Sequence, residues 1–177
     1  MPKKLKILVG IIISVLIIGA ASTSTYILRT TDPEKNEFTP ANVTCRVEES
    51  FVNAVKSNVT VKNTGNVDAF IRAAIVITWE NDKGEVNAAV PNADLDYTMT
   101  LGDGWIKSSD GFYYYPAAVA AGANTDKLIK TCTASDTAPE GYRLNVQILA
   151  TALQADPPRA VENAWNVTVN GKTLTPN

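Results

Sequence analysis

Histidine is absent from the 177-residue sequence. Its absence excludes Ser-His-Asp and Cys-His catalysis, the histidine-containing zinc sites of metalloproteases, and the most common general acid and base at neutral pH. Cysteine is scarce, because Cys45 and Cys132 are the only two, and their spacing is not that of a metal knuckle or a thioredoxin-type motif. The composition therefore predicts a protein that is not an enzyme and that uses no cofactor and no metal.

The two cysteines have two interpretations. Cys45 and Cys132 lie 87 positions apart. In an exported chain, a disulfide that closes so long a loop would stabilise the fold by about 4–5 kcal/mol in the chain-entropy model. Alternatively, both are unpaired and act as small apolar residues of the core. The sequence leaves both interpretations open.

The amino terminus has the layout of an export signal. Lys3, Lys4 and Lys6 precede an apolar run over residues 7–21, and a Ser/Thr cluster follows at residues 22–25. This order of segments predicts a secretory signal peptide over residues 1–21. The alternative is an uncleaved anchor helix that continues to Leu28. Both interpretations place the folded part outside the cell, and only this segment is expected to meet a membrane.

The exported part is acidic. Without the three lysines of the signal segment, the remaining 13 of the 16 basic residues face 18 acidic ones, which changes the net charge from −2 to −5. A chain of this balance has no electrostatic attraction to nucleic acid or to anionic lipid. The sequence therefore predicts no nucleic-acid partner.

Beyond a leader at residues 22–38, of which residues 30–38 are polar, the hydrophobic pattern has a period of two. The odd-numbered residues from Ile71 to Trp79 are apolar, for example, whereas Arg72 and Thr78 lie between them. Strands are expected at residues 43–51, 58–62, 71–80, 97–101, 104–107, 112–115, 126–133 and 142–152. Short strands separated by turn residues predict an all-β fold, an antiparallel jelly-roll-like β-sandwich over residues 39–155. Alternation also predicts that each sheet keeps one wet face.

The last segment, residues 156–177, predicts one short helix and a terminal hairpin. Asp156 is expected to cap the helix, and Pro157 to occupy its first position. The residues on one face of this helix, by their spacing, are Val161, Ala164 and Trp165. The pair Asn170-Gly171 is typical of a tight hairpin turn between residues 167–169 and 172–174.

Five aromatic residues lie close together, at position 105 and at positions 112–115. An exposed group of this kind, with Trp105, Tyr113 and Tyr115 as its candidate residues, would bind sugar rings or a protein partner. The alternative is core packing. Neighbouring residues of a strand point to opposite faces, so alternate members of the run would fill the interior.

Two segments of the body carry a recognisable pattern: residues 36–44, which read NEFTPANVT, and residues 57–72, which read SNVTVKNTGNVDAFIR. Further matching residues follow at 110–115, 153–156 and 164–165. In these segments the chain resembles the TasA/camelysin-like secreted proteins of Gram-positive bacteria. The run NTGNVDAFIR at residues 63–72 is the most specific element of the likeness.

The resemblance implies a jelly-roll sandwich, export with the dedicated signal peptidase SipW, and a role in an extracellular biofilm matrix or surface fibre. It also implies self-association, in which an amino-terminal segment of one subunit completes a sheet of the next. The corresponding segment here is the leader, and its candidate donor residues are Thr25, Tyr26, Ile27 and Leu28. Some relatives are labelled metallopeptidases, but a chain without histidine offers no motif for a zinc hydrolase.

The sequence thus predicts an exported, non-enzymatic structural protein that assembles into fibres or matrix by strand addition. Two alternatives stay open. One is a cell-surface binding or adhesion module that recognises glycans or proteins through residues 105–115. The other is an accessory or anchoring subunit of such fibres.

Overall fold

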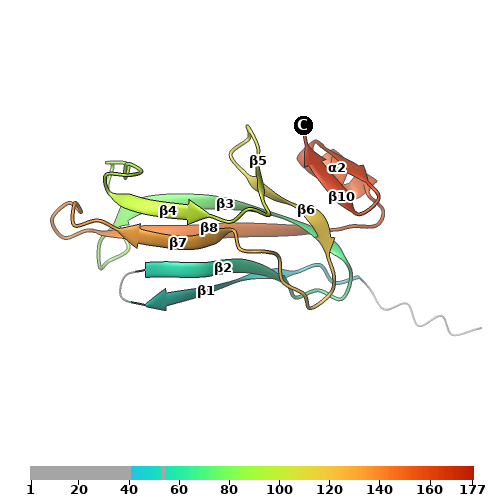
Figure 1. Ribbon diagram of the computed structural model, residues 1–177, viewed down its shortest axis with the longest axis horizontal. Coiled ribbons are helices and arrows are strands. Elements are labelled where there is room, and N and C mark those ends of the chain that lie inside the picture. Colours follow the sequence, from blue (N-terminus) through green and yellow to red (C-terminus); the bar gives the residue numbers. More distant parts are fainter. Residues whose placement is uncertain (1–40, 53–54) are drawn as a thin grey trace, which may run out of the picture. The chain divides into compact units, whose positions relative to one another are not determined.

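The structure is a computed structural model that describes residues 41–52 and 55–177 (Figure 1). The predictions for the signal segment, the leader and the candidate donor residues Thr25, Tyr26, Ile27 and Leu28 lie outside the described residues. The body of the chain, Pro40–Asn177, is a compact unit by itself. No helix in the described part has the length and apolar character that crossing a bilayer requires.

The described residues form ten strands in two antiparallel sheets. The first sheet has the order β1 (Cys45–Val52), β2 (Val55–Asn63), β7 (Ile129–Ala134) and β4 (Tyr97–Leu101). The second sheet has the order β8 (Arg143–Gln154), β3 (Ala69–Glu80), β6 (Tyr113–Val119), β10 (Thr173–Pro176) and β9 (Val167–Asn170). The short strand β5 (Ile106–Lys107) pairs with β6, and the helix α2 (Arg159–Trp165) follows β8 in sequence.

The chain changes sheet between most consecutive strands, as it does in a jelly roll. The steps from β2 to β3, from β3 to β4, from β6 to β7 and from β7 to β8 all cross from one sheet to the other. Figure 1 shows the two resulting layers, with β4 and β7 in front of β3 and β8. The prediction of an antiparallel, jelly-roll-like β-sandwich with one short C-terminal helix is confirmed.

The main core lies between the two sheets and follows the period-two pattern. Ile71 and Ala73 of β3 are fully buried and belong to the same cluster as Val59 and Val61 of β2. Full burial of a valine or isoleucine side chain contributes about 1.5–3 kcal/mol relative to exposure. The alternation that predicted the strands therefore also supplies most of the driving force for packing the sheets together.

A second, smaller core lies on the outer face of the second sheet. There α2 and the β9–β10 hairpin cover Phe70 of β3 and Tyr114 of β6, which are both fully buried. The residues that cover them are Val161, Trp165 and Leu174. The prediction that each sheet keeps one wet face is wrong here, because the C-terminal segment adds a third layer over one end of the sandwich (Figure 1).

The helix α2 begins later than the sequence predicts. Its N-cap is Pro158 rather than Asp156, and no side chain caps the first turn. A residue that precedes proline disfavours the helical region. This applies to Asp156 and to Pro157, so the helix starts beyond both. Of the three residues expected on the inner face, the buried ones are Val161 and Trp165, and the exposed one is Ala164.

The turn between β2 and β3 holds the start of the described chain. The N–H of Asn66 donates to the carbonyl of Asn42 at 3.0 Å, and the N–H of Asn42 donates to the Asn66 side-chain oxygen at 2.7 Å. A Cβ atom on Gly65 would lie 2.2 Å from the Asn42 carbonyl oxygen, so this approach requires glycine. The described chain therefore begins at the end of the sandwich that carries this turn.

Candidate functional site

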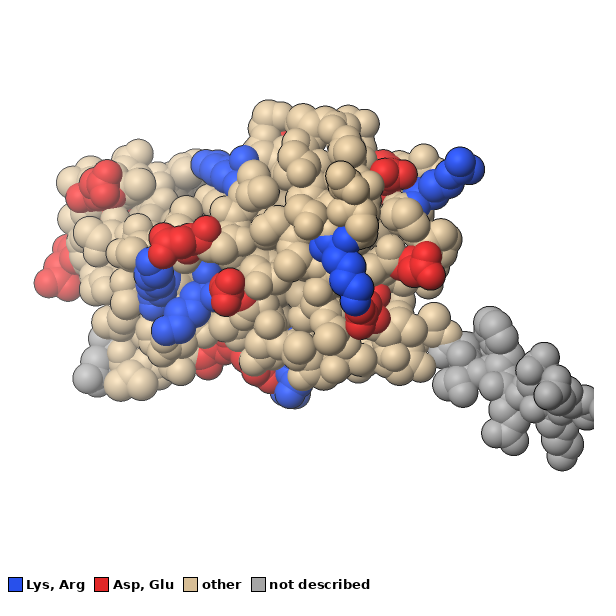
Figure 2. Space-filling model, turned by 45° about the vertical axis from the view of Figure 1, so that its right-hand side comes forward, with Lys and Arg blue, Asp and Glu red and all other residues tan. Residues whose placement is uncertain are grey.

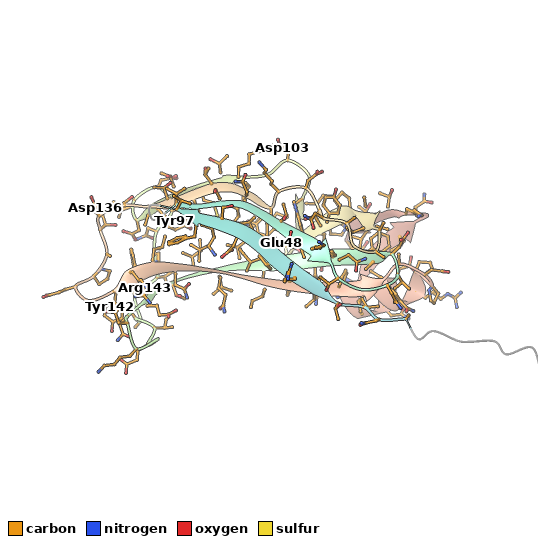
Figure 3. All side chains as sticks on the ribbon, turned by 90° about the horizontal axis from the view of Figure 1, so that it is seen from below. Glu48, Tyr97, Asp103, Asp136, Tyr142 and Arg143 are labelled. Atoms are coloured by element: carbon orange, nitrogen blue, oxygen red, sulfur yellow. The ribbon has the colours of Figure 1, made fainter. Side chains whose placement is uncertain are left out.

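Two free strand edges flank one side of the sandwich. Among the described residues, β1 pairs only with β2, and β8 pairs only with β3. The two strands belong to different sheets, and residues of both line the same depression in the surface. Figure 3 looks onto this side, where β1 and β8 converge at one end and stand apart toward the end that carries Tyr142 and Arg143. A free edge offers N–H and C=O groups with which another extended segment can pair.

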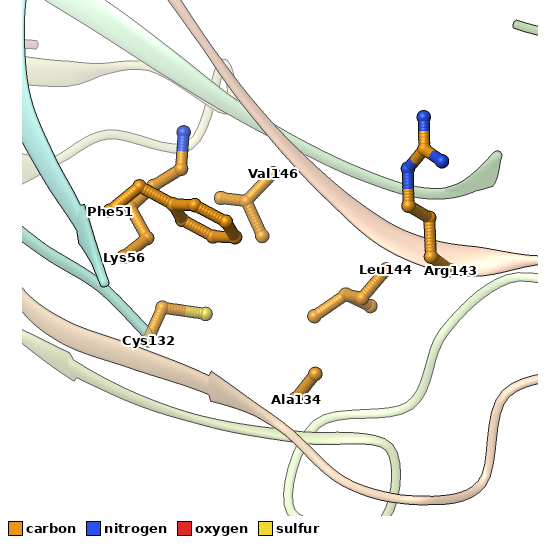
Figure 4. A pocket seen from close by; sticks show the side chains of 7 residues that line it. All are labelled: Phe51, Lys56, Cys132, Ala134, Arg143, Leu144 and Val146. Atoms are coloured by element: carbon orange, nitrogen blue, oxygen red, sulfur yellow. The ribbon is translucent and has the colours of Figure 1, made fainter. Parts of the chain in front are cut away.

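A groove runs between these two edges. Its shallow part is lined by Val47 and Glu49 of β1, by Lys56 of β2 and by residues 145–148 of β8. A hollow of about 160 Å³ adjoins it near the end of β1 and shares Lys56 and Val146 with the shallow part. The residues that line this hollow (Figure 4) are Phe51, Lys56, Cys132, Ala134, Arg143, Leu144 and Val146. In this view the apolar side chains converge on the hollow, whereas Arg143 points away from it.

The groove is suited to an extended segment with apolar side chains at alternate positions. Short edge strands are one device by which proteins protect a sheet from unwanted pairing. The edge strands β4 and β9 have only 5 and 4 residues, whereas β8 has 12. At the hollow, Phe51 of β1 is 69% exposed. A strand that paired with the long edge of β8 would cover this ring and fill the hollow with its inward side chains.

One ion pair lies inside the groove. The ammonium group of Lys56 contacts the two carboxylate oxygens of Glu49 at 2.9 and 2.8 Å. Sequence reasoning singled out neither residue. Glu49 shares the face of Val47 by regular alternation. A period of two counted back from buried Val59 places Lys56 on the solvent face. Asn58 lies between Lys56 and Val59 with a left-handed φ of 54°, and this irregularity turns Lys56 inward. Asn58 is the only sequence signal for this, since asparagine tolerates the left-handed region.

Cys45 and Cys132 are free thiols in the structure. Cys45 of β1 pairs with Asn63 of β2, and Cys132 of β7 pairs with Lys56 of β2. These partner positions are seven residues apart, or roughly 23 Å along the strand. A disulfide requires Cα atoms within about 7 Å, so the structure supports the unpaired interpretation. Burial raises the pKa of both thiols, which favours the protonated, unreactive form.

The aromatic residues considered as an interaction surface lie inside the sandwich. Trp105 and Tyr113 are each 9% exposed, and Tyr115 packs half-buried against the same core. The indole N–H of Trp105 donates to the carbonyl of Asp126 at 3.0 Å, and the Trp105 and Tyr115 ring centroids lie 5.4 Å apart. The exposed-platform interpretation is thereby corrected. Both faces of β6 are covered, so odd-numbered rings in residues 112–115 join the main core and even-numbered rings join the second.

Asp96 forms hydrogen bonds that hold the loop before β8, the strand that lines the groove. Its carboxylate accepts hydrogen bonds from the N–H of Asn92 and from the hydroxyl of Thr137, both at 2.7 Å. Its carbonyl accepts one from the N–H of Ser135 at 2.8 Å. The hydrogen bonds to the carboxylate hold the pKa of Asp96 below its ordinary value. Asp96 thus ties the loop before β4 to the loop between β7 and β8.

We expect Asp96→Asn to reduce the loss of stability on acidification. A carboxylate whose pKa is lower in the folded state stabilises fully above its unfolded pKa of about 3.9, and this stabilisation is lost as the pH falls through the folded pKa. Urea unfolding between about pH 3 and pH 7 should show a shallower decline for Asp96→Asn than for the wild type. The exposed Asp136, in the same loop as Thr137 (Figure 3), provides the control variant Asp136→Asn. Equal flattening by both variants would contradict the assignment.

Charged side chains are dispersed over the face shown in Figure 2, where basic and acidic groups are interspersed. Some form exposed ion pairs, such as Lys130 with Asp103 and Lys172 with Asp68. Within residues 41–52 and 55–177, no group of three or more His, Cys, Asp and Glu side chains is placed to hold a metal ion. In comparisons with known proteins, no family model, no curated protein and no solved structure matches the chain.

Proposed function

We propose that the protein is an exported, non-enzymatic subunit of an extracellular fibre or biofilm matrix that assembles by strand addition. In this proposal a signal peptidase removes residues 1–21, and the leader of one subunit enters the groove between β1 and β8 of the next. The resemblance to TasA/camelysin-like proteins supports the class of function. The absence of histidine supports a role without catalysis.

The observation that carries the proposal is the pair of free edges along a groove that contains a largely apolar hollow. Backbone groups of β8 would pair with the leader, and the groove, including the hollow beside Leu144 and Val146, would receive its side chains. Tyr26 and Leu28 are two positions apart in the leader, a spacing that puts both on one face of a strand. Burial of an apolar side chain of this size contributes about 1.5–3 kcal/mol.

The length of the leader and the place where the described chain begins also support the proposal. Residues 22–38 span up to roughly 60 Å when extended, whereas the 12 residues of β8 span about 40 Å. The described chain begins beside the β2–β3 turn, at the opposite end of β1 from Phe51. A head-to-tail contact between a leader and the groove of another copy is heterologous, so it extends into a filament when the rotation between copies does not close a ring.

Purified residues 22–177 should therefore form filaments that are visible by electron microscopy. Residues 40–177, which lack the leader, should keep the mass of a monomer in size-exclusion chromatography with light scattering, because the groove has no strand to accept. Both preparations should show the same far-ultraviolet circular dichroism of a β-sandwich.

The matched control keeps the length of the leader and removes its apolar face. Residues 22–177 with Tyr26→Asp and Leu28→Asp should stay monomeric, because the two substitutions remove the apolar side chains whose burial stabilises the contact. A wild-type preparation of residues 22–177 that remains monomeric under all conditions would overturn the proposed function.

A further inference from the structure

Lys56 has an unusual place for a lysine, because its side chain points between the two sheets. It stands opposite Phe51 of β1 and opposite Cys132 of β7, and Cys132 is buried. The Lys56 side chain is only 13% exposed. A lysine at such a position needs a charged partner. An inward-pointing charge beside an edge strand is also a device that blocks indiscriminate strand pairing.

The partner of Lys56 comes from the adjacent strand β1. By regular alternation Glu49 shares the inward face with Val47, and both line the groove. The register shift between Glu48 and Ser50 reflects one extra residue in β2, because β1 advances two residues there while β2 advances three, from Thr60 to Ser57. The Glu49 side chain is 35% exposed. An ion pair with so accessible a member is weak, and the carboxylate can return to water at small cost. Glu49 is therefore an exchangeable partner that neutralises Lys56 while the groove is empty.

We propose that Lys56 selects the strand that enters the groove, by exchanging Glu49 for an acidic side chain of that strand. The occupant is the leader of a second copy, and the acidic residue is Asp32. This inference rests on the proposed function and deepens it, since strand addition could occur without any such selection.

The period of a strand and the position of Pro33 together single out Asp32 among the acidic residues of the leader. In an extended segment, Tyr26, Leu28 and Asp32 all lie on one face. Pro33 follows directly and has no N–H to give to a strand edge, so regular pairing ends after Asp32. Glu34 would share the face of Asp32 but lies beyond the proline, and Glu37 lies beyond it on the opposite face.

An antiparallel alignment with β8 brings matching groups together. With Leu28 opposite Ile148, Asp32 falls opposite Leu144, because both steps are four residues. Ile148 lines the shallow part of the groove, and Leu144 lines the hollow that also contains Lys56. The apolar part of the leader then meets apolar side chains, and its carboxylate meets the ammonium group. A strand with an apolar residue at the place of Asp32 would cover Lys56 without giving it a partner, which is unfavourable.

The test measures the affinity of a fluorescent peptide of residues 22–38 for the body, residues 40–177, by anisotropy. The body is suitable because both hydrophobic cores lie within the compact unit Pro40–Asn177. The Asp32→Lys peptide should bind the wild-type body about tenfold more weakly or worse, and so should the wild-type peptide with the Lys56→Glu body. The Asp32→Lys peptide with the Lys56→Glu body should recover most of the affinity, because the reversed charges again form a pair.

Two charge reversals serve as matched controls. Lys62 lies on the same strand as Lys56 but between the inward-facing Val61 and Asn63, so its side chain faces outward. The Lys62→Glu body and the Glu37→Lys peptide should each bind as the wild type does. Thermal unfolding establishes that each body variant folds. If Lys56→Glu does not fold, Lys56→Met replaces it, and this body should no longer prefer the wild-type peptide to the Asp32→Leu peptide.

The outcomes distinguish selection by Lys56 from strand addition itself. Recovery of affinity by the paired reversals supports selection by Lys56. If the losses of affinity caused by Asp32→Lys and Lys56→Glu add in the double variant, and affinity does not recover, selection by Lys56 is overturned. Strand addition is then still supported. Equal binding of the Asp32→Leu and wild-type peptides to the wild-type body overturns it as well. If the wild-type peptide binds neither the wild-type body nor any variant, the inference and the proposed function both fall.

Discussion

Replacement of Asn63 by alanine is expected to lower the free energy of unfolding by about 3–5 kcal/mol. The Asn63 side chain is fully buried. Its amide nitrogen donates to the carbonyls of Val67 at 2.8 Å and Val119 at 2.9 Å, and its oxygen accepts from the N–H of Gly65 at 3.0 Å. Alanine leaves two carbonyls and one N–H without this partner. The bond to Val119 is buried and the other two are partly buried, and an unsatisfied buried group costs about 1–3 kcal/mol. Urea unfolding followed by circular dichroism measures the change.

Two further variants show whether the hydrogen bonds of Asn63 cause the effect. Asn63→Asp keeps an acceptor for Gly65 but turns a carboxylate toward two carbonyls, so at neutral pH it should destabilise at least as much as alanine. Asn163 is exposed on α2, and Asn163→Ala should change stability by less than about 0.5 kcal/mol. An Asn63→Ala variant no less stable than Asn163→Ala would show that the buried amide does not brace the turn.

The strands β3 and β8 could be predicted from the sequence because their alternation is long and regular. They pair along their whole length, from Ala69 opposite Gln154 to Glu80 opposite Arg143. A shift by one residue would turn every inward side chain outward. The hydrophobic pattern therefore determines the strands, the register and the main core at the same time.

A period-two pattern could not predict the second core. Phe70 is buried on the face opposite to Ile71, because a segment about ninety residues later in the chain folds back over it. The consecutive apolar residues Ala69, Phe70 and Ile71 were the available signal, since a strand buried on both faces loses its alternation. Local sequence did not indicate which segment would supply the cover.

The groove could be predicted only in outline. A free edge follows from the idea of strand addition, and Glu49 shares the inward face of Val47 by regular alternation. The inward position of Lys56, however, depends on the left-handed backbone at Asn58. Irregularities of one residue leave no mark on hydrophobic periodicity. The leader, which carries the candidate donor residues, lies outside the described residues.

Replacement of Tyr114 by alanine should lower the free energy of unfolding by about 3–5 kcal/mol and loosen the C-terminal layer. The ring is fully buried and lies edge-on to Trp165 with centroids 5.9 Å apart. Its hydroxyl donates to Asp110 at 2.7 Å and accepts from Arg72 at 3.3 Å. Alanine removes the ring, leaves a cavity between β6 and α2, and takes away both hydrogen bonds.

Arg72 is the reason that the effect should spread through the whole layer. Its guanidinium lies 4.1 Å from the Phe112 ring centroid and 4.8 Å from that of Trp165, so it joins the sheet to the helix. Each such contact contributes about 0.5–2 kcal/mol. Tyr114 and Thr151 position Arg72 through hydrogen bonds of 3.3 Å. Without Tyr114, Arg72 loses one of these two anchors and Trp165 loses its ring partner in the same step.

Hydrogen exchange followed by mass spectrometry tests this coupling. In Tyr114→Ala, the amides of α2, β9 and β10 should exchange faster than those of β3 and β8, because the layer opens before the sandwich does. Tyr114→Phe keeps the ring and removes only the hydroxyl, so it should cost about 1–2 kcal/mol and leave the layer closed. Tyr142→Ala, at the far end of the sandwich (Figure 3), should leave exchange in the layer unchanged. Uniformly faster exchange in Tyr114→Ala, with β3 and β8 affected as much as α2, would mean that the layer and the sandwich unfold as one unit.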